Sequence, residues 1–198
     1  MIAIVGAQDE EILGIKDLMD DRKEMLLHGY QYCLGTIANQ PVILAKSKIG
    51  SVACSILMAL LFTHFDIRVA INVGTAGSFK ASGIKPGTIV VAEHLSYYDA
   101  DLTFFGHYEY GQMAASPRFY ESAQFLVAAI ANEKWSFELA FGTILSGEKF
   151  VTAQQDVLKI IEHEFENSDV LALDMESTYF AQACYIFNKP FLVLRVIS

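Results

Sequence analysis

Four short segments of the sequence place acidic and small residues directly after runs of apolar residues. They are GAQDEE at 6–11, NVGTAGS at 72–78, SGEKFV at 146–151 and LDMES at 173–177. Each apolar run has the length of a buried strand, and α/β sheets bind their ligands at the carboxyl ends of strands. We therefore expect these segments to converge on a site for a small molecule, with carboxylates as its reactive groups.

The acidic and aromatic residues of these segments each have a structural and a functional interpretation. The acids that follow Gly6 would stabilise the dipole of the next helix, or one of them would face the strand ends as a general base. Capping of a helix explains Asp174, whereas Glu176 is placed to accept hydrogen bonds from two sugar hydroxyls. Phe150 is either a core residue or a stacking surface for a flat base. These residues alone indicate an acid-rich site for a small molecule.

Other common sites are not supported by the spacing of the residues. The segment 72–78 is not a GxGxxG fingerprint, since no acid stands about twenty residues later and Glu93 is the nearest candidate; no Gly-Lys-Ser/Thr follows it either. The five histidines have no partner at metal-ligand spacing, and a Ser-His-Asp triad has no nucleophile elbow. A dinucleotide-dependent oxidoreductase, a P-loop enzyme, a metal site and a serine hydrolase are therefore disfavoured.

Composition and charge limit the possible partners and the compartment. The net charge is −9 and no run of Lys or Arg occurs, which argues against nucleic acid and anionic membranes as partners. The longest apolar run, 52–62, is too short to span a bilayer, and no basic segment precedes the first apolar run. Three widely separated cysteines are typical of a reducing cytosol. We expect a cytoplasmic protein whose 53% hydrophobic residues also supply a subunit interface.

Apolar runs of strand length alternate with amphipathic runs of helical length. Strands are expected at 2–5, 30–37, 42–46, 69–73, 88–95, 141–145, 170–173 and 191–197. Helices are expected at 9–19, 51–64, 117–132, 152–163 and 177–187. The helix at 51–64 is expected to bury Ala53, Ile56, Leu57 and Leu60, and 100–116 is expected to be a long functional loop. This alternation predicts an α/β fold over 1–198, a single-domain three-layer sandwich with a mostly parallel central sheet flanked by helices.

The same segments resemble motifs of the methylthioadenosine/S-adenosylhomocysteine nucleosidases, a branch of the nucleoside phosphorylase family. The motifs of that branch run close to GAMEEE, NTGSAGG, YHDADxTAFGYEYGQ, VSGDxF, VEMEATA and RAISD. Here they stand, in the same order, as GAQDEE, NVGTAGS, YYDADLTFFGHYEYGQ, LSGEKF, LDMESTY and RVIS. The match runs from Met1 to Ser198, and the combination of YDAD–EYGQ with MES after a strand is specific. The resemblance implies a nucleoside phosphorylase-like fold.

The resemblance also implies an activity and a role for each matched residue. It implies hydrolysis of the N9–C1′ bond of 5′-methylthioadenosine or S-adenosylhomocysteine to adenine and a thioribose, without cofactor or metal, by a homodimer. Glu11 matches the acid that activates water, and Glu176 the carboxylate that holds the ribose hydroxyls over Met175. Phe150 matches the residue that stacks on adenine, with the Val151 backbone at its edge. Four other matched positions line the ribose and water side: Thr75, Ala76, Gly77 and Arg195. Two more, Ile49 and Phe105, lie around the alkylthio group, and Phe105 is supplied across the dimer interface in the family.

Departures from the motifs leave alternatives to this activity. Ser198 matches the residue before the family's purine-protonating Asp, so the resemblance implies that 1–198 lacks this acid and the final helix of the domain. Loss of a general acid costs ~10² to 10⁴ in rate, so weak or no activity is expected. Gln8, Lys48 and Asp174 replace a Met, a Gly and a Glu of the motifs, which affects the preference for the 5′ substituent. The alternatives are a phosphate-dependent nucleoside phosphorylase and a catalytically impaired protein that binds adenine nucleosides.

Overall fold

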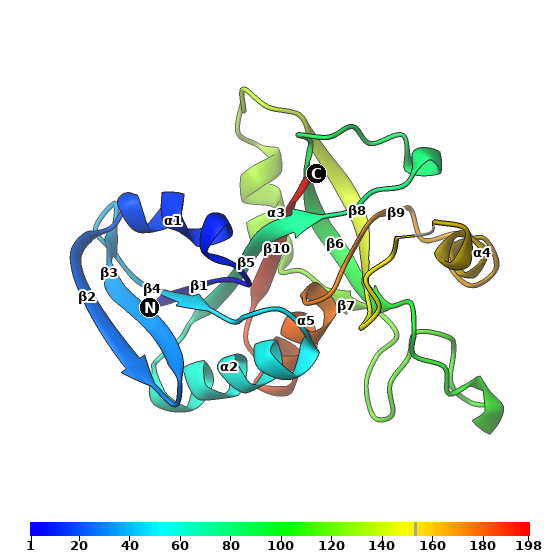
Figure 1. The fold of residues 1–198 in the computed structure, drawn as a ribbon, viewed down its shortest axis with the longest axis horizontal. Coiled ribbons are helices and arrows are strands. Elements are labelled where there is room, and N and C mark those ends of the chain that lie inside the picture. Colours follow the sequence, from blue (N-terminus) through cyan, green and yellow to red (C-terminus); the bar gives the residue numbers. More distant parts are fainter. Residues whose placement is uncertain (153) are drawn as a thin grey trace.

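A sheet of ten strands runs through the molecule, and helices cover both of its faces (Figure 1). The computed structural model describes residues 1–152 and 154–198. The strands are β1 (Ile2–Gly6), β2 (Asp20–Leu27), β3 (Tyr30–Ile37), β4 (Gln40–Lys46), β5 (Val69–Ala76), β6 (Ile89–Tyr97), β7 (Tyr120–Glu121), β8 (Leu139–Ser146), β9 (Val170–Asp174) and β10 (Phe191–Ile197). The helices are α1 (Asp9–Asp17), α2 (Ser51–His64), α3 (Gln124–Ala131), α4 (Gln154–Glu164) and α5 (Ser177–Ile186), with short 3-10 turns η1 (Lys80–Ser82) and η2 (Thr103–Phe105).

The sheet contains two parallel blocks that run in opposite directions. The strand order is β2-β3-β4-β1-β5-β10-β6-β8-β9, and β7 pairs with β6. Strands β4, β1, β5 and β10 are parallel to one another, as are β6, β8 and β9, but β10 and β6 are antiparallel. The single-domain α/β fold predicted from the sequence is confirmed, and the sheet is mixed.

Each face of the sheet is covered by a different pair of helices. Along β1, Ala3 and Val5 pack in one cluster with α2 and α5, whereas Ile2 and Ile4 pack in another with α1. Helix α3 lies on the same face as α1, and α4 lies beside β9 at the edge (Figure 1). Because successive side chains of a strand point to opposite faces, a strand covered on both sides needs a continuous apolar run.

Most of the expected elements are present, and two regions differ. The predictions for 51–64 and 191–197 match α2 and β10 in full. Strand β2 was missed because its residues DDRKEMLL lie almost entirely exposed at the edge of the sheet and show no apolar period. The helix expected from 117 begins at Gln124 instead. Tyr120 comes before it, pairs with Leu95 in the sheet and is buried against the ring of Tyr97.

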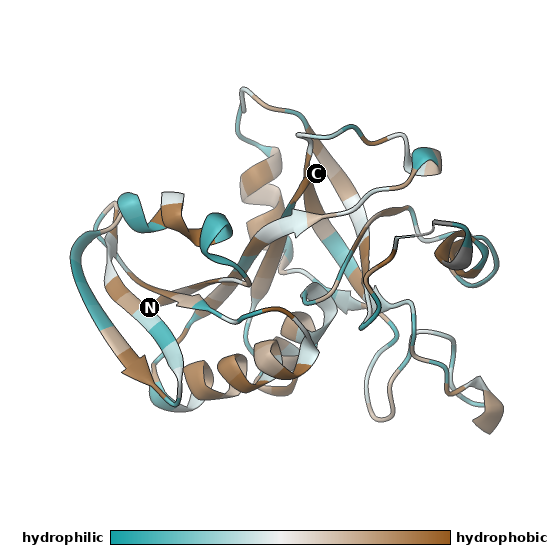
Figure 2. Cartoon of the chain, in the orientation of Figure 1, coloured by the Kyte–Doolittle hydropathy of each residue, from teal (hydrophilic) through white to brown (hydrophobic). Residues whose placement is uncertain are grey.

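Helix α2 buries a face that overlaps only in part with the one expected: Leu57 is buried and Leu60 packs against the core, as predicted. The prediction that Ile56 is buried is wrong, since its side chain is 48% exposed, and that of Val52 is 70% exposed. The fully buried positions of this helix are Cys54, Leu57, Met58 and Leu61. Apolar residues occupy most of its length (Figure 2). The helix therefore covers the sheet with one side and leaves apolar side chains on its outer side.

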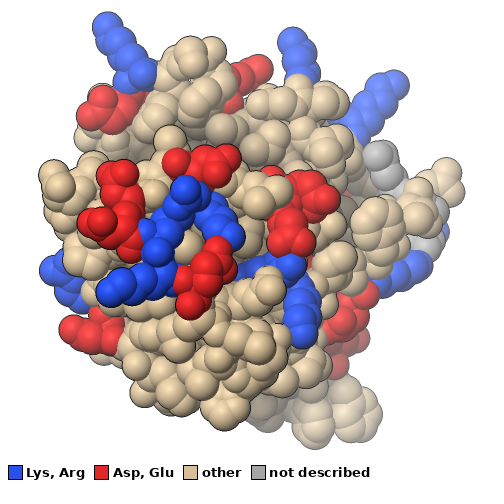
Figure 3. Space-filling model, turned by 60° about the vertical axis from the view of Figure 1, so that its left-hand side comes forward, with Lys and Arg blue, Asp and Glu red and all other residues tan. Residues whose placement is uncertain are grey.

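The loop predicted at 100–116 is present and extends away from the sheet (Figure 1). Its turn η2 carries Phe104, 94% exposed, and Phe105, 61% exposed. On the side of the molecule that carries β2, basic side chains lie beside acidic ones (Figure 3), as in the ion pair of Lys16 with Glu24. No helix within residues 1–152 and 154–198 is long and apolar enough to cross a bilayer.

Candidate active site

A cavity of about 350 Å³ brings together ten of the twelve site residues expected from the sequence. Those ten residues are Glu11, Ile49, Thr75, Ala76, Gly77, Phe150, Val151, Met175, Glu176 and Ser198. They come from the ends of β5, β9 and β10 and from the segments that follow β1, β4 and β8. All four polar segments singled out in the sequence thus contribute to one cavity.

The four segments meet for a reason other than the one expected. Strand β9 belongs to the block that runs opposite to β5, so their carboxyl ends do not share an edge through parallel pairing. They meet because the N–H of Gly77 donates to the carbonyl of Leu173 at 3.0 Å and the reverse bond is 2.8 Å. This antiparallel bridge joins the ends of the two blocks directly at the cavity.

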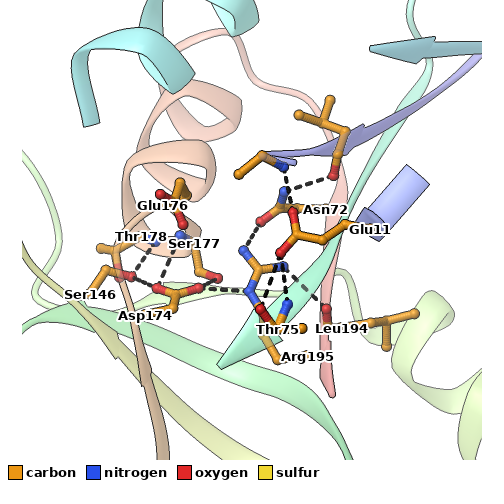
Figure 4. A network of polar contacts seen from close by, with 12 residues as sticks. Glu11, Asn72, Thr75, Ser146, Asp174, Glu176, Ser177, Thr178, Leu194 and Arg195 are labelled. Carbon is orange, nitrogen blue, oxygen red and sulfur yellow. Dashed lines mark hydrogen bonds and ion pairs between the residues drawn. The ribbon is translucent and has the colours of Figure 1, made fainter. Parts of the chain in front are cut away.

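The Glu11 carboxylate reaches from the first turn of α1 to the end of β5 (Figure 4). Its Oε2 accepts the N–H groups of Ala7 and Gln8 at 2.7 and 3.0 Å, which is the capping role. Its Oε1 accepts the N–H of Thr75 at 2.9 Å and the Thr75 hydroxyl at 3.3 Å. A Cβ atom on Gly74 would lie 2.8 Å from that oxygen, so the glycine leaves room for the carboxylate. Capping therefore explains one oxygen of Glu11, and the other faces the cavity side of β5.

Glu176 begins α5 and is buried at the opposite side of the same cavity. Its Oε1 accepts the N–H of Gly50 at 2.9 Å. Burial raises the pKa of Glu176, the nearby Asp174 carboxylate adds to the rise, and the hydrogen bond from Gly50 opposes it. Phe150, 74% exposed, stands at the cavity on the segment after β8. The cavity is thus lined by the carboxylates of Glu176, Glu11 and Asp174 and by an exposed aromatic ring.

Arg195 does not line the cavity with the other expected residues, because its side chain is buried in an ion pair with Asp174. It is 2% exposed, and its Nε donates to Oδ2 of Asp174 at 2.8 Å (Figure 4). A second guanidinium nitrogen donates to Oδ1 of Asn72, whose amide nitrogen donates to the Val5 carbonyl at 2.8 Å. A buried guanidinium needs a counter-charge, and Asp174 supplies it from β9. Asp174 was interpreted as a capping residue, and it does accept the N–H of Ser177 at 3.2 Å.

Phe105 also lies outside the cavity of its own chain. Its ring is on the exposed turn η2, where it contacts the rings of Phe104 and Tyr108. The resemblance to the nucleosidases assigns it to the site of a partner subunit, and in the single chain it stays outside the cavity.

Several residues of the cavity wall were missed by sequence reasoning. Most of them are apolar. Val157, Leu158 and Ile161 lie on one side of α4, and Phe79 and Leu173 come from other segments. The signal that could have found them is the spacing of Val157, Leu158 and Ile161, which marks the apolar side of an amphipathic helix. Gln8 and Lys149 add polar groups to the wall. Among the side chains that the structure describes, no group of three His, Cys, Asp or Glu is arranged to hold a metal ion.

The fold and the cavity define an α/β protein with an acid-lined site for a small molecule. The chain belongs to the phosphorylase superfamily, whose family model matches residues 1–198. Its structure is similar to that of the MTA/SAH nucleosidase of Streptococcus pneumoniae in complex with 8-aminoadenine. The TM-score is 0.93 at 37% sequence identity, over 100% of this chain and 84% of that chain.

Two further solved structures show the range of proteins that this chain is similar to. One is the 5′-methylthioadenosine/S-adenosylhomocysteine nucleosidase of Colwellia psychrerythraea 34H in complex with adenine, with a TM-score of 0.91 and 34% identity, over 100% of this chain and 81% of that chain. The other is the futalosine hydrolase of Helicobacter pylori strain 26695, with a TM-score of 0.88 and 33% identity, over 100% of this chain and 83% of that chain.

The buried ion pair predicts a large loss of stability when its charge balance is broken. In Asp174→Asn the Arg195 guanidinium stays charged, because an arginine does not lose its proton in proteins, and it loses the carboxylate with which it is paired. We expect the free energy of unfolding to fall by about 3–5 kcal/mol in urea titrations. Lys46→Met breaks the exposed pair with Asp9, which joins Nζ and Oδ1 at 2.7 Å, and should cost at most about 1 kcal/mol. Equal losses in the two variants would contradict the assigned role.

The raised pKa of Glu176 predicts that this residue lowers the stability of the fold at neutral pH. A carboxyl whose pKa is raised in the folded state stabilises the fold below its unfolded pKa, and this contribution is lost as the pH rises through the folded pKa. Glu176→Gln keeps an oxygen that accepts from Gly50 and removes the buried charge. We expect its Tm near neutral pH to exceed that of the wild type by roughly 2–4 °C, the shift for about 1 kcal/mol in a chain of this size.

The control for this measurement is Glu148→Gln, which changes an exposed carboxylate that does not line the cavity. Its Tm should follow that of the wild type at every pH. The advantage of Glu176→Gln should shrink at about pH 4, near the ordinary pKa of a glutamate. A Tm difference that stays constant between the two pH values would show that the charge of Glu176 is not its cause.

Proposed function

We propose that this protein hydrolyses the N-glycosidic bond of 5′-methylthioadenosine, S-adenosylhomocysteine or both, releasing adenine and a thioribose. The observation that carries the proposal is the placement of Glu11 and Glu176 on one cavity that also contains Phe150. The similarity to nucleosidase structures in complex with adenine and 8-aminoadenine supports the same substrate class. The acid-lined cavity supplies groups suited to a sugar, and the aromatic ring supplies one suited to a base.

Glu176 is proposed to hold the ribose, and Glu11 to activate the attacking water. Water forms its bond to C1′ as the C1′–N9 bond breaks, and the electron pair of that bond leaves with the purine. The proton lost by the water passes to Glu11, the departing purine takes up a proton from solvent, and Glu11 returns its proton to solvent before the next turnover. As the bond breaks, the sugar develops the positive charge of an oxocarbenium ion, which the Glu176 carboxylate stabilises.

The remaining cavity residues are proposed to recognise the two ends of the nucleoside. Phe150 stacks on the adenine, and the backbone of Val151 binds its edge. Met175 packs beneath the sugar, and Ile49 contacts the 5′ substituent together with Gln8, which lies on the same wall. Thr75, Ala76 and Gly77 line the cavity on the ribose and water side, and Ser198 is a further lining residue.

The charges of the cavity favour a hydrolase over a phosphate-dependent phosphorylase. A phosphorylase needs a cationic pocket for its anionic co-substrate. Lys149 is the one basic residue among the described residues that line the cavity. Arg195, a candidate for a second cation, is buried and already paired with the Asp174 carboxylate. The carboxylates of Glu11 and Glu176 would repel phosphate further, so water is the better supported nucleophile.

The variant Glu11→Gln tests the role of the proposed base. Its amide cannot take a proton from water, so we expect kcat for adenine release to fall by about 10² to 10⁴. The Kd for 5′-methylthioadenosine, measured by calorimetry, should change less than threefold. Glu10→Gln alters the adjacent exposed carboxylate of the same helix turn and should leave both values unchanged. Full activity of Glu11→Gln would show that another group activates the water.

The same assay, run with and without inorganic phosphate, separates the alternatives. A hydrolase releases adenine at the same rate in both conditions. Release that requires phosphate would establish the phosphorylase instead. Tight binding of 5′-methylthioadenosine by the wild type without any adenine release would establish a non-catalytic binder of adenine nucleosides.

We further propose that the protein is a homodimer in which the outer side of α2 meets a second copy. Val52 and Ile56 expose apolar side chains on α2, and Phe104 and Phe105 do so on the loop 100–116. Burial of apolar side chains of this size contributes roughly 1.5–3 kcal/mol each when they leave water entirely. A dimer through this surface would also give Phe105 a cavity to reach, that of the partner.

Sedimentation velocity of Val52→Asp tests the proposed dimer. An aspartate at this position would carry its charge into an apolar interface, so we expect a monomer at concentrations at which the wild type is dimeric. The matched control is Leu18→Asp, because Leu18 is 68% exposed and follows α1, on the opposite face of the sheet. A dimer that survives Val52→Asp, or a wild type that is monomeric, would contradict the proposal.

A further inference from the structure

The segment that carries Phe150 has little packing of its own. Residues 147–150 are here called the base loop. Glu148, Lys149 and Phe150 are exposed, whereas Ser146 and Gly147 before them are buried. An exposed ring on an exposed loop stacks on a base only where other contacts determine its position. The position of Phe150 therefore depends on whatever holds the backbone of the base loop.

Three hydrogen bonds hold three consecutive residues of the base loop. The N–H of Gly147 donates to the Asp174 carbonyl at 3.3 Å, and the N–H of Glu148 donates to Oδ2 of Asp99 at 2.8 Å. The Tyr98 hydroxyl donates to the carbonyl of Lys149. Two of these three bonds come from adjacent side chains, Tyr98 and Asp99, in the segment that follows β6.

The base loop lies directly against these two side chains. A Cβ atom on Gly147 would collide with the Tyr98 ring and would lie 2.6 Å from Oδ2 of Asp99. Glycine at this position thus allows the backbone to approach closely enough for both hydrogen bonds. Tyr98 and Asp99 therefore contact the loop through its backbone, and no side chain of the loop is needed for the contact.

The Tyr98 side chain is held in place by the core residues around it. Its side chain is 3% exposed and packs with Leu145 and Phe165 in a small core of its own. Its carbonyl accepts the hydroxyl of Tyr110 at 2.9 Å. Burial raises the pKa of Tyr98 to about 12, so the hydroxyl stays protonated and donates at neutral pH. The buried Tyr98 hydroxyl thus donates to the backbone of a loop whose side chains are exposed. A hydrogen bond from a packed side chain restricts the movement of such a loop.

We propose that Tyr98 and Asp99 are positioning residues that clamp the base loop and thereby place Phe150 and Val151 against the base of the substrate. The inference rests on the proposed function for the identity of the ligand, and on the hydrogen bonds above for the clamp itself. Neither residue lines the cavity, so they act on the base through the loop. The clamp affects recognition of the base and leaves the sugar end, with Glu11 and Glu176, unchanged.

The experiment measures the clamp and its consequence separately. Tyr98→Phe removes the hydroxyl and keeps the ring, Asp99→Ala removes the acceptor, and the double variant removes both bonds. Hydrogen–deuterium exchange of peptides covering 147–152 reports the mobility of the loop without any ligand. Calorimetry with adenine reports base binding, and calorimetry with 5-methylthioribose reports sugar binding. Thermal melts confirm that the fold is intact.

Two further variants serve as controls within the same segment. Asp101→Ala removes a nearby carboxylate. Among the described residues, this carboxylate accepts hydrogen bonds only from Thr103, from its N–H at 3.0 Å and from its hydroxyl at 2.6 Å. This variant should behave as the wild type. Asp99→Asn keeps an oxygen that accepts from Glu148 and should recover most of the loss caused by Asp99→Ala.

We expect faster exchange across 147–152 in each single variant and an adenine Kd raised by about threefold to tenfold, the loss expected from one hydrogen bond. The double variant should exceed either, and the Kd for 5-methylthioribose should stay within twofold of the wild type. Unchanged exchange in the double variant overturns the clamp, and so does faster exchange with unchanged adenine binding. Equal losses for adenine and 5-methylthioribose also overturn it.

A wild type that binds neither compound contradicts the proposed function and, with it, the role of the clamp in base recognition. The exchange data still decide in that case whether the clamp exists.

Discussion

The buried pair of Asp174 and Arg195 is the interaction on which the site depends. It connects β9, in one parallel block of the sheet, with β10, in the other, at the point where the two blocks meet beneath the cavity. Burying two charges is costly, and the cost is offset only where both are well paired and hydrogen-bonded. Here Arg195 also donates to Asn72, and Asp174 also accepts from Ser146 at 2.5 Å. The pair therefore favours one relative placement of the blocks, the one that brings Glu11 and Glu176 to a common cavity.

Much of this arrangement was predictable from the sequence, because it follows from local patterns. The continuous apolar runs of β5 and β10 and the turn residues after them indicate buried strands that end at a site. The convergence of the four segments was predicted for the wrong reason, since parallel strands with a common edge do not account for it. The bridge between Gly77 and Leu173 joins strands of opposite direction, and a pairing between residues so distant in the chain leaves no trace in local spacing.

Arg195 and Phe105 show two different limits of the sequence reasoning. An arginine at the end of an apolar strand is equally compatible with a cavity wall and with a buried ion pair. The choice depends on whether a carboxylate of another strand lies opposite, which spacing along β10 does not reveal. Phe105 has no contact with the cavity of its own chain, so no pattern within one chain determines its function. Strand β2 is a third case, because a charged edge strand is stabilised by backbone pairing rather than by an apolar face.

The two ends of the cavity are held by different kinds of interaction, and this difference has a functional consequence. On the proposed function, the sugar end is the part supported by buried charges and by the start of α5, and the base end is the loop that hydrogen bonds from Tyr98 and Asp99 hold by its backbone. Rigid placement matters most where charge develops during the reaction, because prearranged groups avoid reorganisation at that moment. In the proposed reaction the base must also leave after the bond is broken, and the loop that contacts it is held by a few hydrogen bonds. On this proposal, release of the base needs only these bonds to open, because a segment with few buried contacts opens at a lower free energy than a core.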